Sequence, residues 1–265
     1  MSKQTLGGSF MIYDAVKQDF PVEAVLDMYL DLCDVVAVLD CGPGDAHKDL
    51  LAKYKGKIIV KKGDWYQYPN IHRFEHLPRQ IIFELGTAWH LHLQADEILH
   101  EDAHGLVREL IEDNRWDGYL MRRLNLWTSY DKVIRFDAPK KPIDDISLRL
   151  ARKFTSPTMD LTRDNDLLCI TRRICWDFID RLPIFHYGLV TDWRVRAQKV
   201  LRNLEENFGR PSDRDQRLVR SLEEGRYRYE DFPWTSWIKD LEMEHPKYVK
   251  KWMDNPDRRM VDHDR

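Results

Sequence analysis

The chain has few cysteines, no long apolar run and no large excess of charge of one sign. Its four cysteines have no C-x-x-C spacing, so a zinc ribbon or a disulfide framework is not indicated and free thiols in a reducing compartment are expected. No run of about 18 apolar residues occurs, so no membrane span is expected. The N-terminus lacks the charged start and apolar core of a signal peptide, and a cytoplasmic location is therefore expected.

The composition that remains is that of a globular protein. Of 265 residues, 43% are hydrophobic and 11% are aromatic, which is enough to build a sizeable core and argues against disorder. The formal net charge is −3, and the C-terminal half is mildly basic. That small basic excess permits a polyanionic partner without requiring one.

The first third of the chain alternates strand-like and helix-like patterns, which predicts an α/β fold. A parallel, doubly wound sheet with right-handed crossovers follows from this order. Ligands of such sheets bind beyond the carboxyl ends of the strands, here near Asp14, Asp40 and Asp64. The predicted elements are strands at 10–13, 34–40 and 57–61 and helices at 22–30 and 46–54.

Later segments predict more strands and a helical C-terminal part. We expect a domain over 1–190 and a helical extension over 191–265 that could bind an acceptor. The predicted helices are 77–88, 103–114, 192–208 and 212–224, with a helical turn in 173–181. The predicted strands are 89–94, one from 118, 149–154 and 167–171, and the Pro-rich stretch 137–147 is predicted to be a loop.

Two acidic segments follow predicted strands. Asp40 begins an Asp-x-Gly-x-Gly-Asp turn ending at Asp45, and a carboxylate there could bind a ribose or base edge, although such turns end many strands. The run from Gln94 to Glu97 places two adjacent carboxylates at a strand end, where they repel each other unless a cation or solvent relieves them. A divalent metal would use this pair; the alternative is a solvated loop start with a helix-capping acid.

Histidines occur in three patterns. His100-Glu-Asp-Ala-His104 formally matches the zinc-protease motif, but its first histidine comes too soon after a strand for both to lie on one established helix, which favours a chance match. His90 and His92 alternate with apolar residues, and satisfied polar positions are favoured there over ligands. His186, in Phe-His-Tyr-Gly, could present an imidazole to a metal or a phosphate.

These segments together resemble the family-2-like GT-A glycosyltransferases of bacteria and phages. The resemblance covers about residues 7–205. Its most specific part is Leu-Gln-Ala-Asp-Glu-x-x-His-Glu-Asp, which stands intact here. The matching segments are Gly7–Phe10, Lys17–Val22, Cys33–Val38, Cys41–Asp45, Leu93–Asp102 and His186–Gly188.

The resemblance implies a GT-A fold, a Rossmann-like doubly wound mixed sheet with helices on both faces, that binds a nucleotide-sugar, with UDP as the nucleotide, and a divalent metal, Mn²⁺ or Mg²⁺. The implied donor-binding residues are Asp14, Asp19, Asp40, Asp45, Gln94 and Ala95. Asp96 takes the last position of the Asp-x-Asp metal motif, and Glu97 and His186 assist it. Gln94 replaces the first carboxylate of that motif, which puts more of the metal binding on Asp96.

The same resemblance implies an acidic base that deprotonates the acceptor hydroxyl if transfer inverts the anomeric centre. Asp160 is the first candidate and Asp164 the second, with Asp144 and Asp145 behind them. Arg73 and Arg79 could pair with phosphate or simply be exposed helix-end arginines.

The expected activity is hexosyl or pentosyl transfer to an acceptor hydroxyl. The acceptor could be a glycan, or hydroxymethylated DNA as in phage-type base glycosylation, which would take place in a host cytoplasm; aromatics among arginines in 226–237 motivate that variant. Remote alternatives are a nucleotidyltransferase, a zinc hydrolase using the His100–His104 motif and a non-enzymatic binding module. The oligomeric state does not follow from the sequence.

Overall fold

A computed structural model of the chain describes residues 3–68, 77–78, 80–113, 115–127, 129–134, 146–152, 173–175, 177–188, 190, 220, 224 and 238–255. The strands are β1 (Leu6–Ile12), β2 (Val35–Asp40), β3 (Ile59–Lys62), β4 (Trp89–His92), β5 (Glu97–Leu99), β6 (Gly118–Leu126), β7 (Lys132–Ile134), β8 (Ile146–Arg152), β9 (Ile174–Cys175), β10 (Pro183–His186) and β11 (Ile238–Asp240). The helices are α1 (Val22–Leu32), α2 (Lys48–Ala52), α4 (Ala103–Glu112) and α7 (Lys250–Met253), with short 3-10 helices η1 (Trp65–Gln67), η2 (Phe83–Leu85), η3 (Ile179–Arg181) and η6 (Lys247–Val249).

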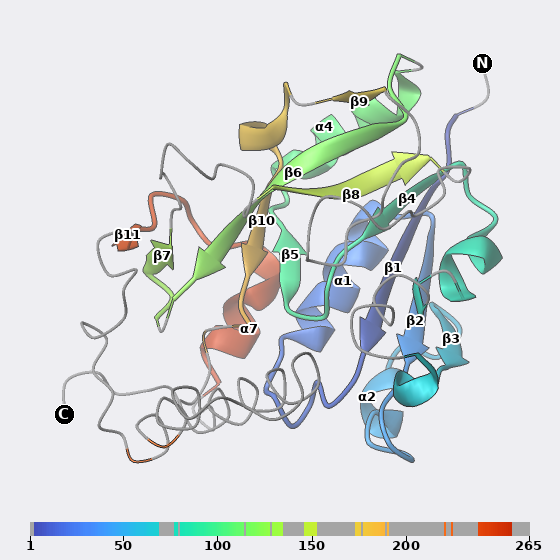
Figure 1. Ribbon diagram of the computed structural model, residues 1–265, viewed down its shortest axis with the longest axis vertical. Coiled ribbons are helices and arrows are strands. Elements are labelled where there is room, and N and C mark those ends of the chain that lie inside the picture. Colours follow the sequence, from blue (N-terminus) through green and yellow to red (C-terminus); the bar gives the residue numbers. More distant parts are fainter. Residues whose placement is uncertain are drawn as a thin grey trace.

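One mixed sheet organises the described residues (Figure 1). Its main path runs β11-β7-β6-β8-β4-β1-β2-β3. The β4-β1-β2-β3 part is parallel, whereas β8 runs antiparallel to both β4 and β6. Beside this path, β10 pairs parallel with β6 and antiparallel with β5. The doubly wound, mixed α/β sheet predicted from the sequence is therefore confirmed.

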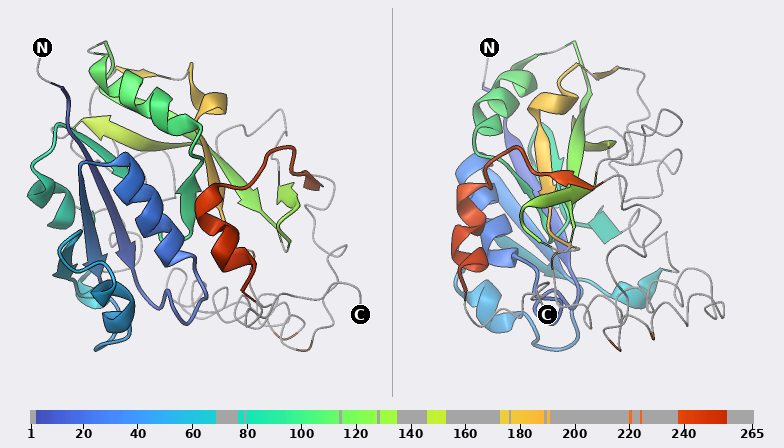
Figure 2. Two further views of the ribbon diagram at one scale, coloured as in Figure 1. Left: turned by 180° about the vertical axis from the view of Figure 1, so that it is seen from behind. Right: turned by 90° about the vertical axis from the view of Figure 1, so that its left-hand side faces the viewer.

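Helices cover both faces of this sheet. Successive residues of a strand point to opposite faces, and in β2 Val36 and Val38 belong to the core that includes α1, while Ala37 and Leu39 pack with the segment 77–85. Figure 2 shows α1, α4 and α7 together on one side and the 77–85 segment on the other. Both faces of the sheet are therefore packed against other elements, and the turns that follow the strands lie at its ends.

Two consecutive glycines let the layers approach β1 closely. A Cβ on Gly7 would lie 2.5 Å from Thr87 Oγ1, and a Cβ on Gly8 would lie 2.3 Å from Tyr29 Cδ1 on the other face. Larger side chains would push away the helical layers. The Gly-Gly pair is therefore a packing requirement of the central strand.

Several predicted elements differ from the observed ones. The stretch 173–181 contains β9 followed by η3, not only a helical turn. Strand β8 starts at Ile146, so the end of the predicted 137–147 loop is a strand that pairs with β4 and β6. The strand predicted at 167–171 and the helices predicted at 192–208 and 212–224 lie outside the described residues, apart from positions 220 and 224.

The described C-terminal residues join the same sheet and core. β11 pairs antiparallel with β7, and Val249 is fully buried in the main core. The predicted boundary at 190/191 stays a prediction, because most of 191–237 lies outside the described residues. Within the described part of the chain, no helix has the length and apolar character needed to cross a bilayer.

Candidate active site

The carboxyl ends of the parallel strands carry the polar residues that the sequence singled out. β1 leads to Asp14, β2 ends on Asp40, and β4 leads into Gln94 and Asp96. In open α/β sheets this edge is where ligands bind. The sheet therefore brings these positions to one edge, although the first and the last of them, Asp14 and Asp96, lie more than 80 residues apart in sequence.

Asp96 and His186 come together at this edge. Asp96 Oδ2 lies 3.4 Å from His186 Nε2, and both side chains are largely buried. The Tyr187 amide donates a hydrogen bond to the Asp96 carbonyl oxygen at 2.8 Å. Because β10 pairs with β5 directly after Asp96, the His-Tyr-Gly turn is fastened against the Gln94–Asp96 turn.

Asn125 fixes the orientation of the His186 ring. His186 Nδ1 lies 2.6 Å from Asn125 Oδ1 on the neighbouring strand β6, so Nδ1 carries a proton and donates it. Nε2 then either holds a second proton and forms an ion pair with Asp96, or directs its lone pair toward the carboxylate. A lone pair facing an anion is favourable only with a cation between them, and an outer hydrogen bond of this kind is typical of metal-ligating histidines.

Gly188 leaves room for this pair. A Cβ on Gly188 would lie 2.2 Å from Asp96 Oδ2 and 2.7 Å from His186 Nε2. Such distances are far inside van der Waals contact, so no other residue fits without displacing the carboxylate or the imidazole. Gly188 is a site residue that the sequence indicated only as part of the turn.

Glu97 and Tyr29 hydrogen-bond to the backbone of the residues just before Asp96. Glu97 Oε2 accepts a hydrogen bond from the Gln94 amide at 2.9 Å, while Glu97 Oε1 lies 2.7 Å from Arg149 and 3.8 Å from Arg123. The Glu97 side chain is fully buried. Its carboxylate contacts two arginines and the Gln94 amide, so its role is to position the turn.

Tyr29 of α1 ties the two central strands to each other at the same place. Its hydroxyl donates to the Ser9 carbonyl oxygen at 2.9 Å and accepts from the Leu93 amide at 2.7 Å. Burial, with a smaller contribution from Cys33, raises the pKa of Tyr29 well above its usual value, so the hydroxyl keeps its proton. This contact positions the chain just before Gln94.

Asp40 is buried and saturated with hydrogen bonds. It accepts from His47 Nδ1 at 2.7 Å, from Lys62 Nζ at 2.6 Å and from the Gly42 amide at 3.0 Å. Burial alone would raise the pKa of Asp40, but these hydrogen bonds lower it. Asp40 itself is hidden from solvent. Lys62, whose side chain is 60% exposed, is the member of this cluster that reaches solvent at the edge of the sheet.

Asp14 and Asp19 lie in the loop that follows β1, and both adopt left-handed backbone conformations, with φ of 51° and 53°. Non-glycine residues there are uncommon and are enriched in Asp and Asn. The Gln18 amide donates to the Asp14 carbonyl oxygen at 2.9 Å, so the loop folds back on itself. Both carboxylates remain partly exposed.

The other predicted site residues are placed less centrally. Asp45 is exposed and lies 3.4 Å from Lys48, whereas Ala95 is buried in the turn before Asp96. The candidate bases Asp160, Asp164, Asp144 and Asp145, and the arginines Arg73 and Arg79, lie outside the described residues. Their roles stay predictions.

A group of aromatic residues at this edge was missed by the sequence reasoning. Tyr13, directly after β1, stacks on Trp65 with ring centroids 4.6 Å apart and an interplanar angle of 6°. Its hydroxyl lies 2.7 Å from that of Tyr66, a residue with 65% of its surface exposed. The signal available in the sequence was the Asp-Trp-Tyr run after the third strand.

The histidines of the other motifs do not form a metal centre in the described structure. His90 and His92 are buried on β4, and His92 Nδ1 lies 3.0 Å from Ser9 Oγ. Within the described ranges, no group of three or more His, Cys, Asp or Glu side chains could hold a metal ion. Any metal at Asp96 and His186 would need further ligands from a substrate or water.

Comparison with known proteins gives distant structural similarity only. No family model and no curated protein matches the chain. A crystal structure of S. aureus TarS is 11% identical with a TM-score of 0.44, over 84% of this chain and 43% of that one. GalNAc-T7 with UDP, GalNAc and Mn²⁺ is 11% identical with a TM-score of 0.35, over 47% of this chain and 23% of that one.

A third solved structure has a different activity in its description. A chain described as a glucose-1-phosphate thymidylyltransferase from Bacillus anthracis is 10% identical with a TM-score of 0.44, over 69% of this chain and 90% of that one. The match to TarS described above spans less than half of the TarS chain. At these identities sequence-specific roles do not transfer, and we base the functional assignment on the geometry of the site.

Proposed function

We propose that this protein is a metal-assisted glycosyltransferase that moves a sugar from a nucleotide-sugar, with UDP as the nucleotide, to an acceptor hydroxyl. The observation that carries the proposal is the Asp96–His186 pair, with a 3.4 Å separation between carboxylate oxygen and imidazole nitrogen. It stands beyond the carboxyl end of β4, where a diphosphate would approach.

The donor set fits a divalent metal. Two ligands of one ion that bind at about 2.1 Å are separated by roughly 3 Å, which is close to the observed separation of the two side chains. An imidazole beside a carboxylate favours a transition ion such as Mn²⁺ over Mg²⁺. When bound, the ion would neutralise charge on the departing nucleoside diphosphate.

The remaining tasks belong to the chain itself. Asn125 orients the His186 ring, and Glu97 holds the Gln94 amide so that the turn keeps Asp96 at the sheet edge. The partly exposed rings of Tyr13 and Tyr66 offer an apolar surface beside β1 on which a nucleobase could stack. The Lys62 ammonium group, paired with Asp40 and 60% exposed, places N–H donors at the same edge for the phosphates of a nucleotide-sugar.

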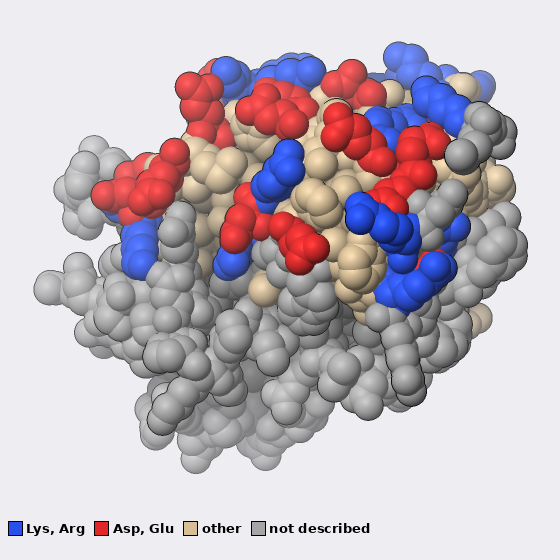
Figure 3. All heavy atoms as spheres, turned by 90° about the horizontal axis from the view of Figure 1, so that it is seen from above, with Lys and Arg blue, Asp and Glu red and all other residues tan. Residues whose placement is uncertain are grey.

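The acceptor class stays open between a glycan and hydroxymethylated DNA. On the face seen in Figure 3, Lys and Arg alternate with Asp and Glu among the described residues. A DNA backbone is bound best by a continuous basic surface, and this face offers none within the residues described. The aromatic and arginine-rich stretch 226–237 that motivated the DNA variant lies outside them.

Binding of UDP tests the proposal most directly. We expect saturating UDP with Mn²⁺ to raise the melting temperature by about 5 °C, since occupancy at about 100 times Kd adds roughly 2.7 kcal/mol. Asp96→Asn should abolish this shift and reduce sugar transfer by about 100-fold or more. Asp254→Asn, an exposed residue after α7, is the matched control.

The products separate the proposal from its alternatives. A glycosyltransferase releases UDP from a UDP-sugar, whereas a nucleotidyltransferase releases or consumes pyrophosphate. Incubation with a panel of UDP-sugars and either oligosaccharides or hydroxymethylated DNA would identify the acceptor class. The absence of any UDP-induced stabilisation, with every metal tested, would contradict the proposal.

A further inference from the structure

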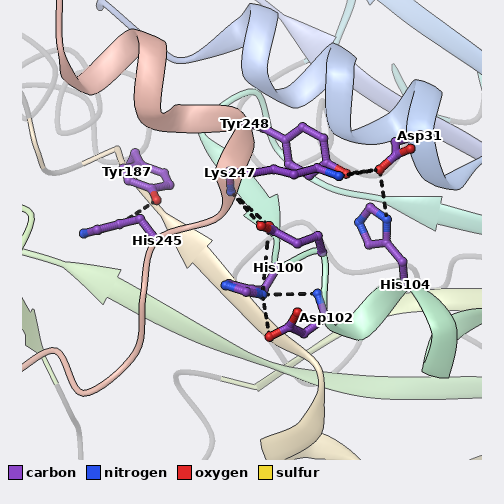
Figure 4. A network of polar contacts seen from close by, with 9 residues as sticks. Asp31, His100, Asp102, His104, Tyr187, His245, Lys247 and Tyr248 are labelled. Carbon is purple, nitrogen blue, oxygen red and sulfur yellow. Dashed lines mark hydrogen bonds and ion pairs between the residues drawn. The ribbon is translucent and has the colours of Figure 1, made fainter.

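The His100-Glu-Asp motif and the C-terminal segment form one polar network (Figure 4). The Glu101 carboxylate accepts hydrogen bonds from the Lys247 amide, at 2.9 and 3.1 Å for its two oxygens. Lys247 Nζ lies 3.1 Å from Asp31 Oδ2, and the Tyr248 hydroxyl donates to the same oxygen. Glu101 and Lys247 are 146 residues apart in sequence, so these contacts fasten the segment at Lys247 and Tyr248 to α1 and to the residues just before α4.

We call residues 245–252 the C-terminal clamp. Its first residue, His245, lies between two tyrosines: Nε2 is 2.9 Å from the Tyr130 carbonyl oxygen, and Nδ1 is 2.9 Å from the Tyr187 hydroxyl. A carbonyl oxygen can only accept, so Nε2 carries the proton. Nδ1 of the neutral ring therefore accepts from the Tyr187 hydroxyl.

Ring packing reinforces this link. The Trp252 ring meets the Tyr187 ring edge-on with centroids 5.4 Å apart, and the His245 ring lies 5.8 Å from that of Phe185 in β10. Tyr187 is 1% exposed and Val249 is fully buried. The clamp thus covers the side of β10 and of the turn that follows it.

Tyr187 connects the clamp to the candidate metal site. It stands between His186 and Gly188, and its amide donates to the Asp96 carbonyl oxygen at 2.8 Å. Its backbone therefore belongs to the site, while its side chain belongs to the interface with the clamp. A shift of the Tyr187 ring would move the neighbouring imidazole relative to the carboxylate.

We propose that the C-terminal clamp positions the Asp96–His186 pair, with the His245–Tyr187 hydrogen bond as the link and Glu101 as the anchor of the clamp. This inference rests on the proposed function, because it assigns the clamp a task at that metal site. It also gives the His100-Glu-Asp motif a role as the docking point of the C-terminal segment, instead of a zinc site.

Three variants in the full-length protein separate positioning from simple packing. Tyr187→Phe removes only the hydroxyl. His245→Gln can keep the contact to the Tyr130 carbonyl oxygen, since its terminal amide reaches the position of Nε2, but it loses the acceptor for Tyr187. His245→Asn does the opposite, because its amide oxygen takes the place of Nδ1.

Mn²⁺ affinity in the presence of UDP is the readout, measured by electron paramagnetic resonance of the free ion, with the melting temperature recorded in parallel. We expect Tyr187→Phe and His245→Gln to weaken Mn²⁺ binding about 10-fold, the lower end of what outer-shell changes cost. His245→Asn should stay within about 3-fold of the wild type. Glu101→Ala, which releases the anchor, should resemble Tyr187→Phe.

The outcomes distinguish the two proposals. If the wild type binds Mn²⁺ with UDP and all four variants bind it equally well, the clamp has a packing role only and the inference is wrong. If His245→Asn and His245→Gln lose affinity to the same extent, the hydrogen bond to Tyr187 is not the link and the inference is again overturned. If the wild type itself binds no Mn²⁺ with UDP, the proposed function fails first.

Discussion

Gly188 shows how strictly a single position can be determined by the site around it. The Gly188→Ala variant would place a methyl group 2.2 Å from Asp96 Oδ2 and 2.7 Å from His186 Nε2. Because this methyl occupies the space between the two groups, we expect Mn²⁺ affinity to fall at least 10-fold and sugar transfer to fall with it. Metal titration followed by transfer assays on the purified variant measures both.

The matched control for this variant is Gly105→Ala. Gly105 lies on the exposed side of α4, and an added Cβ there meets nothing within 4 Å. Alanine is favoured over glycine in a helix interior, so this variant should be more stable by about 0.5–1 kcal/mol with unchanged metal binding. Unimpaired Mn²⁺ binding in Gly188→Ala would contradict the placement of the metal between Asp96 and His186.

Glu97 carries a second prediction at the scale of one residue. Glu97→Gln removes a fully buried charge that faces Arg149 at 2.7 Å, and breaking such a buried pair from one side costs about 3 kcal/mol. We expect urea unfolding to show this loss, together with weaker Mn²⁺ binding, because the carboxamide has a single oxygen that can accept either from Arg149 or from the Gln94 amide but not from both. Glu109→Gln, an exposed change on α4, should stay within about 0.5 kcal/mol of the wild type.

The sequence could predict which residues carry the site only in part. The family resemblance alone predicted that Asp96 and His186 act together. Nothing in the local sequence indicates that two residues 90 positions apart lie in contact. Asn125 contacts His186 because β6 pairs with β10, and Tyr13 contacts Trp65 because the segments that follow β1 and β3 meet at one end of the sheet. Such contacts depend on sheet order, which local patterns do not encode.

At the scale of elements, long regular patterns were predictable and short ones were not. The apolar runs of β1, β2 and β6 and the periodic face of α1 indicated these elements to within a few residues. β5 is three residues long and begins with a charged residue, Glu97, which by itself predicts an exposed position. In the fold Glu97 is buried because Arg149 lies opposite it. Its burial is a consequence of tertiary pairing.

The same reasoning explains the C-terminal elements. β11 pairs with β7 across more than 100 residues, and η6 packs on α1. Both are three-residue elements, too short for a period to be recognised. The sequence therefore predicted a helical extension over 191–265, whereas its described part also adds a strand to the sheet.

At the scale of the whole molecule, buried histidines should make stability depend on pH. Burial lowers the pKa of His92 to about 3, and it also lowers the pKa values of His104 and His245. The usual value of about 6.5 applies to the unfolded chain. Between the folded and unfolded values the unfolded state binds more protons, so the free energy of unfolding falls as the pH falls.

We expect this loss to begin below about pH 6.5 and to reach roughly 1.4 kcal/mol per pH unit for His92 alone. Urea unfolding at intervals from pH 7.5 to pH 4.5 would measure it. His92→Asn should reduce the slope by about that amount, because asparagine can keep a hydrogen bond to Ser9 without titrating. Ser9→Ala removes the partner and leaves the histidine, so it should lower stability at every pH while the slope persists. Equal slopes for the wild type and His92→Asn would mean that protonation of His92 does not cause the loss of unfolding free energy at low pH.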